Sequence, residues 1–196
     1  MFSSKNFLKL CHRNSLDQLV HRLEKKEFIR RIGNGIYDYP RIDLESGLYL
    51  NPRIEDVVKA LEIKFNEKLQ YNGKTALKML GFGDLVVIPY EPVLAENNEK
   101  FCYLTNGRSK KIKVLNYEIN IIRTNIPTPA KKDDIVTLVM QGIIYLGEDY
   151  FKSKDGIQTL NKLLAKLNEK QLNKFKKLIK FAPKWVSNLM HNTKAD

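Results

Sequence analysis

The sequence predicts an α+β fold in two parts, a small module at residues 1–41 and a larger α+β domain at residues 42–196 that ends in a helical segment. Three observations support this prediction. Apolar residues recur at helical spacing in residues 16–23, and again through most of the chain after residue 133. A Gly-Asn-Gly turn separates two short β-prone runs near the end of the first module. Further strand-like runs fill residues 85–122.

The first module is predicted to contain two helices followed by a hairpin. Ser3 is a suitable cap for a short helix over residues 4–10. After a break, Ser15 opens a second helix, and Gln18 three residues on completes a capping box. The turn at residues 33–35 joins the two β-prone runs into a hairpin. The apolar face of the second helix comprises Leu16, Leu19, Val20 and Leu23.

This order of elements is typical of a winged helix-turn-helix. In that motif the second helix fits the major groove, while the wing lies along the backbone or in the minor groove. Asn and Gln suit adenine edges and Arg suits guanine, whereas cations near the wing suit phosphate. The sequence therefore predicts a double-stranded DNA site in this module. Its predicted residues are Arg13, Asn14, Ser15, Gln18, Arg22, Lys25, Arg30, Arg31, Asn34 and Tyr37.

Several of these residues also have a structural interpretation. Gln18 is either a base reader or a member of the capping box. Tyr37 and Tyr39 either stack on a sugar or pack in the core, and the core is the favoured interpretation. Asp17 is left out of the site because its carboxylate would repel phosphate. Two helices and a hairpin also occur in modules that do not bind DNA.

The larger domain is predicted to begin with a helix and to continue through strands into further helices. The first helix starts at Asn51-Pro52 and runs to about residue 66, and a shorter helix at residues 74–80 ends at Gly81. Asn168 with Gln171 is a capping signal for a later helix. The strand-like runs are 85–88, 101–104, 112–115 and 118–122, and the later helices are 134–146, 155–167, 169–181 and 184–190.

Charge is concentrated at both ends of the chain. Residues 1–41 hold nine Lys and Arg against four Asp and Glu, and residues 151–196 hold eleven against three. The cations of the C-terminal stretch are all Lys, which is typical of a solvated helix face, whereas Arg is concentrated at the N-terminal end. We therefore expect the specific site at the N-terminal end. A polyanion is the expected partner of a basic region, because neutralising phosphates releases counterions.

Other classes of function find little support in the sequence. No stretch has the length and apolarity of a membrane span or a signal peptide, so we expect a cytoplasmic protein. Cys11 and Cys102 form no metal or redox pattern, and no Ser/His/Asp or Cys/His set converges. We therefore expect no enzyme, metal or cofactor. A phosphate loop at residues 73–75 is disfavoured because Lys68 stands where that motif needs Gly.

Several stretches resemble the AbiEi-type antitoxin and transcriptional regulator family of bacterial type IV toxin–antitoxin systems. The more specific ones are the Gly-Ile-Tyr of the hairpin and Thr-Asn-Gly-Arg-Ser-Lys-Lys-Ile, and the match spans most of the chain. Members of that family usually have a further helix before the first one here, and this chain begins without it. Glu27 also stands where a Gly often follows the second helix. The similar stretches are 2–8, 16–23, 29–40, 51–52, 73–81, 103–112 and 178–189.

The resemblance implies a function for each part of the chain. The winged helix would repress its own operon, with recognition-helix positions at residues 13–22 and wing positions at residues 30–37. The C-terminal domain would carry antitoxin activity against a nucleotidyltransferase-like toxin, without requiring a stable complex. We therefore expect a DNA-binding autorepressor and antitoxin that binds its own promoter. The alternatives are a protein-interaction module that binds a toxin or another partner without specific DNA binding, and an enzyme acting on nucleic acid.

Overall fold

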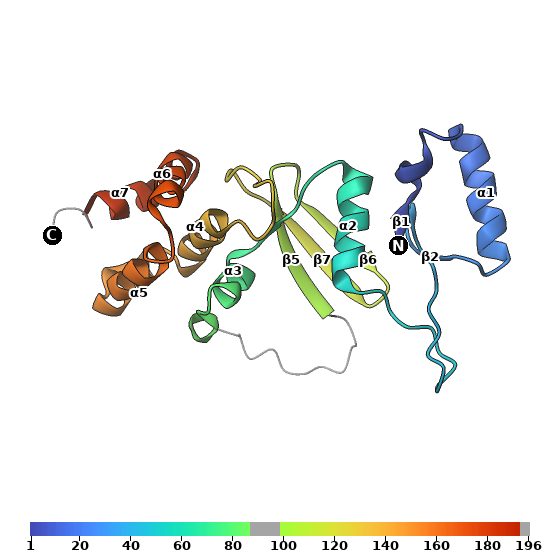
Figure 1. Ribbon diagram of the computed structural model, residues 1–196, viewed down its shortest axis with the longest axis horizontal. Coiled ribbons are helices and arrows are strands. Elements are labelled where there is room, and N and C mark those ends of the chain that lie inside the picture. The colour runs from blue at the N-terminus through green and yellow to red at the C-terminus, as the bar shows by residue number, and fades with distance from the viewer. Residues whose placement is uncertain (87–98, 193–196) are drawn as a thin grey trace. The chain divides into compact units, whose positions relative to one another are not determined.

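The computed structural model describes residues 1–86 and 99–192, and it has the predicted α+β class (Figure 1). Its helices and two sheets fall into two compact units, which are described separately. The predicted boundary lay after residue 41, and the first unit continues beyond it. Among the described residues, unit 1 comprises 1–68, 99–101 and 111–120, and unit 2 comprises 69–86, 102–110 and 121–192.

A small antiparallel sheet forms around the hairpin of unit 1. Its strands are β1 (Phe2–Ser3), β2 (Arg30–Gly33) and β3 (Ile36–Asp38), in the order β1-β3-β2. The hairpin turn lies where the sequence predicts it. Gly35 in this turn has a positive φ of 64°, a conformation that glycine adopts more readily than other residues. The Ser4 amide also donates to the Gly35 carbonyl, which ties the start of the chain to this turn.

The two predicted helices of the module are present with different bounds. The expected helix over residues 4–10 is a single 3₁₀ turn, η1 (Ser4–Phe7), which Ser3 caps as predicted. The long helix is α1 (Arg13–Lys25), and its cap residue His12 makes no side-chain cap hydrogen bond. The predicted capping box of Ser15 and Gln18 is therefore wrong, because the helix has already begun when the chain reaches Ser15.

The buried face of α1 is narrower than the predicted stripe. Leu16 and Val20 are buried with Ile29 and Tyr37, whereas the Leu19 side chain is 46% exposed. Leu19 lies about 60° around the helix axis from Leu16, so it falls outside a face centred on Leu16 and Val20. Tyr39 is also exposed, against the prediction that it packs in the core, because it follows the last residue of β3.

A helix that follows the hairpin in the sequence packs on this sheet in unit 1. It is α2 (Ile54–Phe65), which begins after the predicted Asn51-Pro52 start and contacts β1, η1 and β3. Its inner face is fully apolar, and it ends at Asn66 in a left-handed conformation. The helix that packs on the hairpin sheet therefore lies beyond residue 41, in the part of the chain that the sequence assigned to the larger domain. The buried residues of α2 are Val57, Val58, Ala60 and Leu61.

The second sheet has the strand order β4-β5-β7-β6. β4 pairs with β5 in antiparallel register, with Gln70 opposite Leu104. Three of the four predicted strands are confirmed. In the fourth, at residues 85–88, Leu85 ends a 3₁₀ turn, η2 (Gly83–Leu85), and residues 87–88 lie outside the described residues. The strands are β4 (Gln70–Tyr71), β5 (Glu99–Thr105), β6 (Lys110–Val114) and β7 (Tyr117–Arg123).

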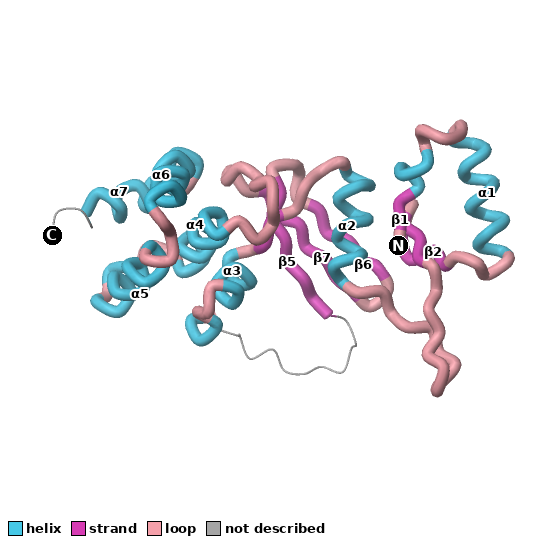
Figure 2. Tube along the Cα trace, viewed as in Figure 1, coloured by secondary structure: helices cyan, strands magenta, loops and turns pink. Residues whose placement is uncertain are grey.

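Figure 2 colours the helices cyan, and α3 to α7 among them belong to unit 2. Each predicted helix after residue 133 is confirmed with shifted ends, and the predicted capping box of Asn168 and Gln171 is present. No helix in the described part of the chain is long and apolar enough to cross a membrane. The helices are α3 (Gly73–Met79), α4 (Ile135–Leu146), η3 (Asp149–Lys152), α5 (Lys154–Leu164), α6 (Glu169–Leu178), η4 (Ile179–Phe181) and α7 (Lys184–Asn192).

The centre of unit 2 is the contact between α3 and α4. A Cβ added at Gly73 would lie 2.2 Å from Tyr145 Cβ and 2.4 Å from the Gln141 carbonyl oxygen. Gly73 therefore allows the close approach of the two helices. This packing role accounts for the glycine of the Gly-Lys-Thr sequence without a phosphate ligand.

Candidate nucleic-acid interface

The predicted polar residues of α1 gather on its solvent side. Asn14, Gln18, Arg22 and Lys25 are all exposed, as are Arg13 and Ser15. In an α-helix, residues four and seven positions apart share a face, so Asn14, Gln18 and Lys25 form one row. Arg22 flanks this row, and the row itself contains no carboxylate. With the capping box absent, the Gln18 side chain is not committed to a cap.

Arg13 differs from the rest because it is paired within its own helix. Its Nε lies 3.1 Å from Asp17 Oδ1 and 2.8 Å from Asp17 Oδ2. The hydrogen bond to Asp17 raises the pKa of Arg13, and the carboxylate offsets its charge. The pair lies on the side of α1 that faces the hairpin, where both residues line a small cavity with Arg31 and Asn34. Arg13 is therefore a poorer candidate for base recognition than the sequence indicated.

Arg30 is held by the fold. Its Nη2 donates to Asp38 Oδ2 and to the Leu50 carbonyl oxygen, both at 3.0 Å, and the guanidinium lies over the Tyr49 ring. These contacts join the hairpin to the segment that follows it. Arg30, which the sequence predicts as a phosphate or minor-groove contact, is therefore a poorer candidate than the exposed Arg31.

Tyr37 is predicted as a DNA contact, but it is buried in the structure. Its side chain is only 8% exposed, and its ring stacks on Phe2 at a centroid distance of 5.7 Å. Residues at this position of β3 face the α1 core, which leaves no free ring face for a sugar. The favoured interpretation of the sequence, in which Tyr37 packs in the core, is confirmed.

A cluster of cations lies beside the hairpin turn. Arg31 and Asn34 are exposed, and Lys64 of α2 donates a hydrogen bond to the Asn34 carbonyl oxygen. Burial lowers the pKa of Lys64, and the positive charges of Arg31 and Lys5 lower it further. Three cations therefore repel one another at this place, and a bound anion would relieve that repulsion. We call Lys5, Arg31 and Lys64 the wing cluster.

Sequence reasoning missed two members of the wing cluster. Lys5 lies in η1, and Lys64 lies in a helix that the sequence assigned to the other domain. Lys64 follows Asn34 by 30 positions, so no local motif links them. Only the docking of α2 on the hairpin sheet brings them together.

Metal-ligating side chains do not cluster in the described part of the chain. Among residues 1–86 and 99–192, no group of three or more His, Cys, Asp or Glu side chains is placed to hold a metal ion. Asp17 and Glu24 line the cavity on the side of α1 that faces the hairpin, whereas the exposed face of α1 and the hairpin turn carry cations, amides and a backbone carbonyl. Such groups bind anions and base edges.

Most of the chain matches the model of a protein family. Residues 1–172 match the model of a family that is described as a family of unknown function (DUF6088). The matched residues include α1, the hairpin and α2, and they extend into α6. No curated protein and no solved structure matches the chain. The match places the chain in a family but indicates no activity for it.

Proposed function

The chain belongs to the DUF6088 family, and for this member we propose a winged helix-turn-helix repressor that binds double-stranded DNA at its own promoter. The element order supports this proposal, since η1 and α1 stand between β1 and the β2–β3 hairpin. The sheet order β1-β3-β2 supports it as well, because a wing is a hairpin paired to a strand that precedes the helices. α2 is then the third helix of the motif.

The observation on which the proposal depends most is the carboxylate-free row on the exposed face of α1. In the proposed complex α1 enters the major groove, which is wide enough for a helix. Asn14 and Gln18 then contact adenine edges, and Arg22 contacts guanine. Lys25 and the wing cluster contact phosphates, which fixes the register of the helix on the duplex.

The second half of the proposal is that the protein is the antitoxin of a type IV toxin–antitoxin system. It rests on the resemblance to the AbiEi-type family. In this proposal unit 2 carries the activity that antagonises a nucleotidyltransferase-like toxin. Restoration of growth when this chain is co-expressed with such a toxin from the adjacent gene would support it. Growth arrest that persists despite soluble expression of both proteins would refute it.

A different observation favours protein binding as a second candidate function. The segment after the hairpin closes through a bridge between Ile42 and Tyr49, and its tip residue Leu44 is 98% exposed. Leu48 and Leu50 nearby are exposed as well. An apolar group of this kind marks a protein contact. Co-purification of a partner that is lost in Leu44→Ser would support this candidate.

Repression is tested by DNA binding at defined salt. The full chain is titrated into a labelled duplex from the region upstream of its own gene, and into a shuffled duplex of equal composition. Specific DNA-binding proteins prefer their sites by a factor of about 10³ or more at physiological salt. We expect a preference of at least about 100-fold, with an affinity that falls as salt rises. Equal affinity for the two duplexes would contradict sequence-specific repression.

A further inference from the structure

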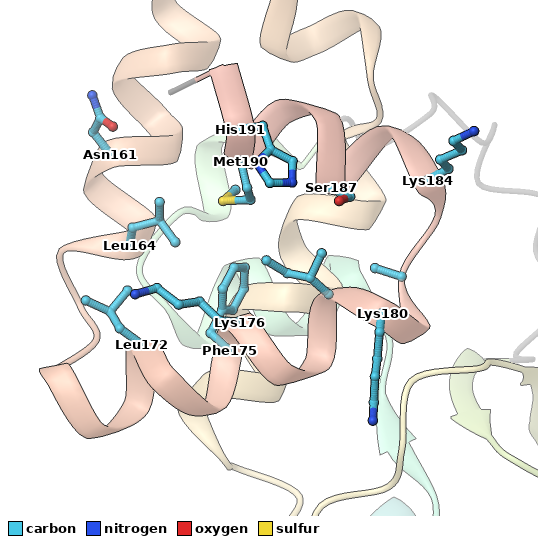
Figure 3. Close-up of a pocket in the computed structure, with 12 residues that line it drawn as sticks. Asn161, Leu164, Leu172, Phe175, Lys176, Lys180, Lys184, Ser187, Met190 and His191 are labelled. Atoms are coloured by element: carbon cyan, nitrogen blue, oxygen red, sulfur yellow. The ribbon is translucent and has the colours of Figure 1, made fainter. Parts of the chain in front are cut away.

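The C-terminal helices of unit 2 surround a cavity of about 730 Å³ (Figure 3). Helices α5, α6 and α7 and the η4 turn supply its walls. Ligand sites in proteins have volumes of about 300–1,000 Å³, so this cavity has the size of a small-molecule site. Its apolar lining consists of Leu164, Leu172, Phe175, Ile179, Ala182 and Met190.

The polar side chains of the cavity are cationic or neutral. Figure 3 shows the Lys176 side chain along the α6 wall, and the His191 ring and Met190 pointing inward from α7. Lys180 and Lys184 lie at the rim and point outward. None of the described lining residues is Asp or Glu, and residues 170–192 contain no carboxylate side chain.

This combination discriminates among ligands by charge. A cationic ligand meets repulsion with no carboxylate to offset it. A purely apolar ligand gains the contacts of the walls but nothing from Lys176. A ligand with an apolar body and one negative group gains both, because a charge-assisted hydrogen bond to an ammonium is stronger than a neutral one.

We propose that this cavity binds a soluble anionic amphiphile, an apolar molecule of the size of a medium-chain fatty acid that carries one carboxylate. Its chain lies against Leu172, Phe175 and Met190, and its carboxylate accepts a hydrogen bond from Lys176 Nζ. The site lies wholly within unit 2, so this proposal does not depend on DNA binding by unit 1.

The test is calorimetric titration of the full chain with three ten-carbon probes below their micellar concentrations. Decanoate is the anionic probe, decanol the neutral one and decyltrimethylammonium the cationic one. We expect saturable binding of decanoate, about tenfold weaker binding of decanol, and no saturable binding of the cation. The fluorescence of Trp185, the only tryptophan and a residue of α7, gives a second readout.

Two neighbouring lysines provide a matched pair of variants. Lys176→Met removes the ammonium that lines the cavity, and it should weaken decanoate about tenfold while leaving decanol unchanged. Lys177→Met removes the same charge from the next residue, which is exposed like Lys176 but does not line the cavity, so it should leave both probes unchanged. Circular dichroism checks that both variants fold.

Three results would overturn the proposal. The first is equal binding of the three probes or no saturable binding of decanoate. The second is an equal effect of the two lysine variants on decanoate. The third is sedimentation of the chain with phosphatidylglycerol vesicles without binding of free decanoate, which would assign the cavity to a membrane surface.

Discussion

The two basic regions of this molecule differ in what lies between their charges. On α1, the amides Asn14 and Gln18 are followed by the cations Arg22 and Lys25 on a solvent-exposed face. On α6, η4 and α7, the cations are all Lys, and three of them, Lys176, Lys180 and Lys184, line a cavity with apolar walls. Net charge identifies both regions as anion-binding candidates, whereas the neutral side chains between the charges distinguish a base-reading face from a cavity for an amphiphile.

The two units also differ in packing. Among the described residues, the cluster beneath α1 has four buried apolar side chains, and the core of α3–α7 has sixteen. Unit 1 also buries apolar residues outside that cluster, among them Ile36, Val57 and Leu61. A steric change inside the core of α3–α7 should therefore destabilise unit 2 strongly, whereas changes on the exposed face of α1 should act on binding.

The largest effect is expected from Gly156→Ala in α5. The new Cβ would lie 2.1 Å from the Tyr150 carbonyl oxygen and 2.8 Å from Phe151 Cα, which are backbone atoms that cannot rotate away. We expect a loss of about 3 kcal/mol in the free energy of unfolding, measured by denaturant titration. Gly83→Ala is the control, since its nearest contact is a flexible Lys78 carbon at 3.9 Å. Equal stability of the two variants would contradict the packing of α5 on η3.

The next effect concerns the α1 face. Arg22→Ala should weaken binding to the upstream duplex by about 2 kcal/mol and reduce the preference over the shuffled duplex. Arg13→Ala should weaken binding less, because Asp17 already offsets the Arg13 charge. Fluorescence anisotropy with both duplexes measures the two variants. A larger loss of preference in Arg13→Ala would show that the wrong side of α1 has been assigned to the bases.

The wing cluster should affect affinity without affecting sequence preference. Lys64→Met should weaken both duplexes alike and should lower the slope of log K against log salt by about 1. Lys59→Met is the control, because Lys59 is an exposed lysine of the same helix outside the cluster. If the two variants have the same salt slope, Lys64 does not contact phosphate.

A smaller effect is expected where α1 ends. Glu27 adopts a left-handed conformation with φ of 59°, which costs a residue with a Cβ about 1 kcal/mol relative to glycine. Glu27→Gly should therefore raise the stability of unit 1 by about that amount in thermal unfolding. Glu24→Gly, inside α1, should instead lower stability by about 1 kcal/mol. A loss of stability in Glu27→Gly would contradict the observed helix end.

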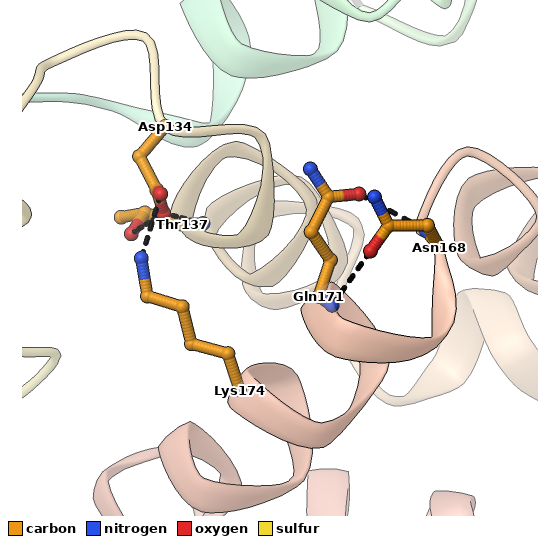
Figure 4. Close-up of polar contacts among 5 residues, drawn as sticks. All are labelled: Asp134, Thr137, Asn168, Gln171 and Lys174. Carbon is orange, nitrogen blue, oxygen red and sulfur yellow. Dashed lines mark hydrogen bonds and ion pairs between the residues drawn. The ribbon is translucent and has the colours of Figure 1, made fainter.

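The smallest effect concerns the start of α4, where Asp134 accepts hydrogen bonds from Thr137 and from Lys174 Nζ at 2.7 Å (Figure 4). Desolvation by burial raises the pKa of Asp134, but the hydrogen bonds from Lys174 and Thr137 outweigh it and hold the pKa below its usual value. A carboxyl with a depressed folded-state pKa stabilises the fold above its unfolded-state pKa, near about 4. This stability is lost as pH falls through the folded-state pKa.

Asp134→Asn tests this assignment because it keeps a cap acceptor and removes the charge. It should cost less than about 1 kcal/mol at pH 7, since Lys174 is half exposed and solvent screens the pair. It should also flatten the loss of stability between about pH 4 and the folded-state pKa, as measured by urea unfolding at a series of pH values. If the variant has the same pH profile as the unaltered chain, Asp134 is not the source of the loss of stability at low pH.

Local patterns predicted most helices, the hairpin and the capping box of Asn168 and Gln171, because periodicity and caps depend on neighbours in sequence. The same reasoning failed for Leu19, since helix phase depends on which partners the helix packs against. It also failed for Arg30 and Lys64, whose roles depend on residues 20 and 30 positions away. Such contacts arise from the docking of whole elements, which no local motif encodes.

We propose that α1 and the hairpin, rather than the lysines of α6 and α7, contact DNA. Amide NMR shifts of the full chain, mapped during titration with the upstream duplex, test it most directly. We expect the shifts to concentrate at residues 14–25 and 31–34 while residues 170–184 stay unchanged. Shifts that concentrate at residues 170–184 would contradict it.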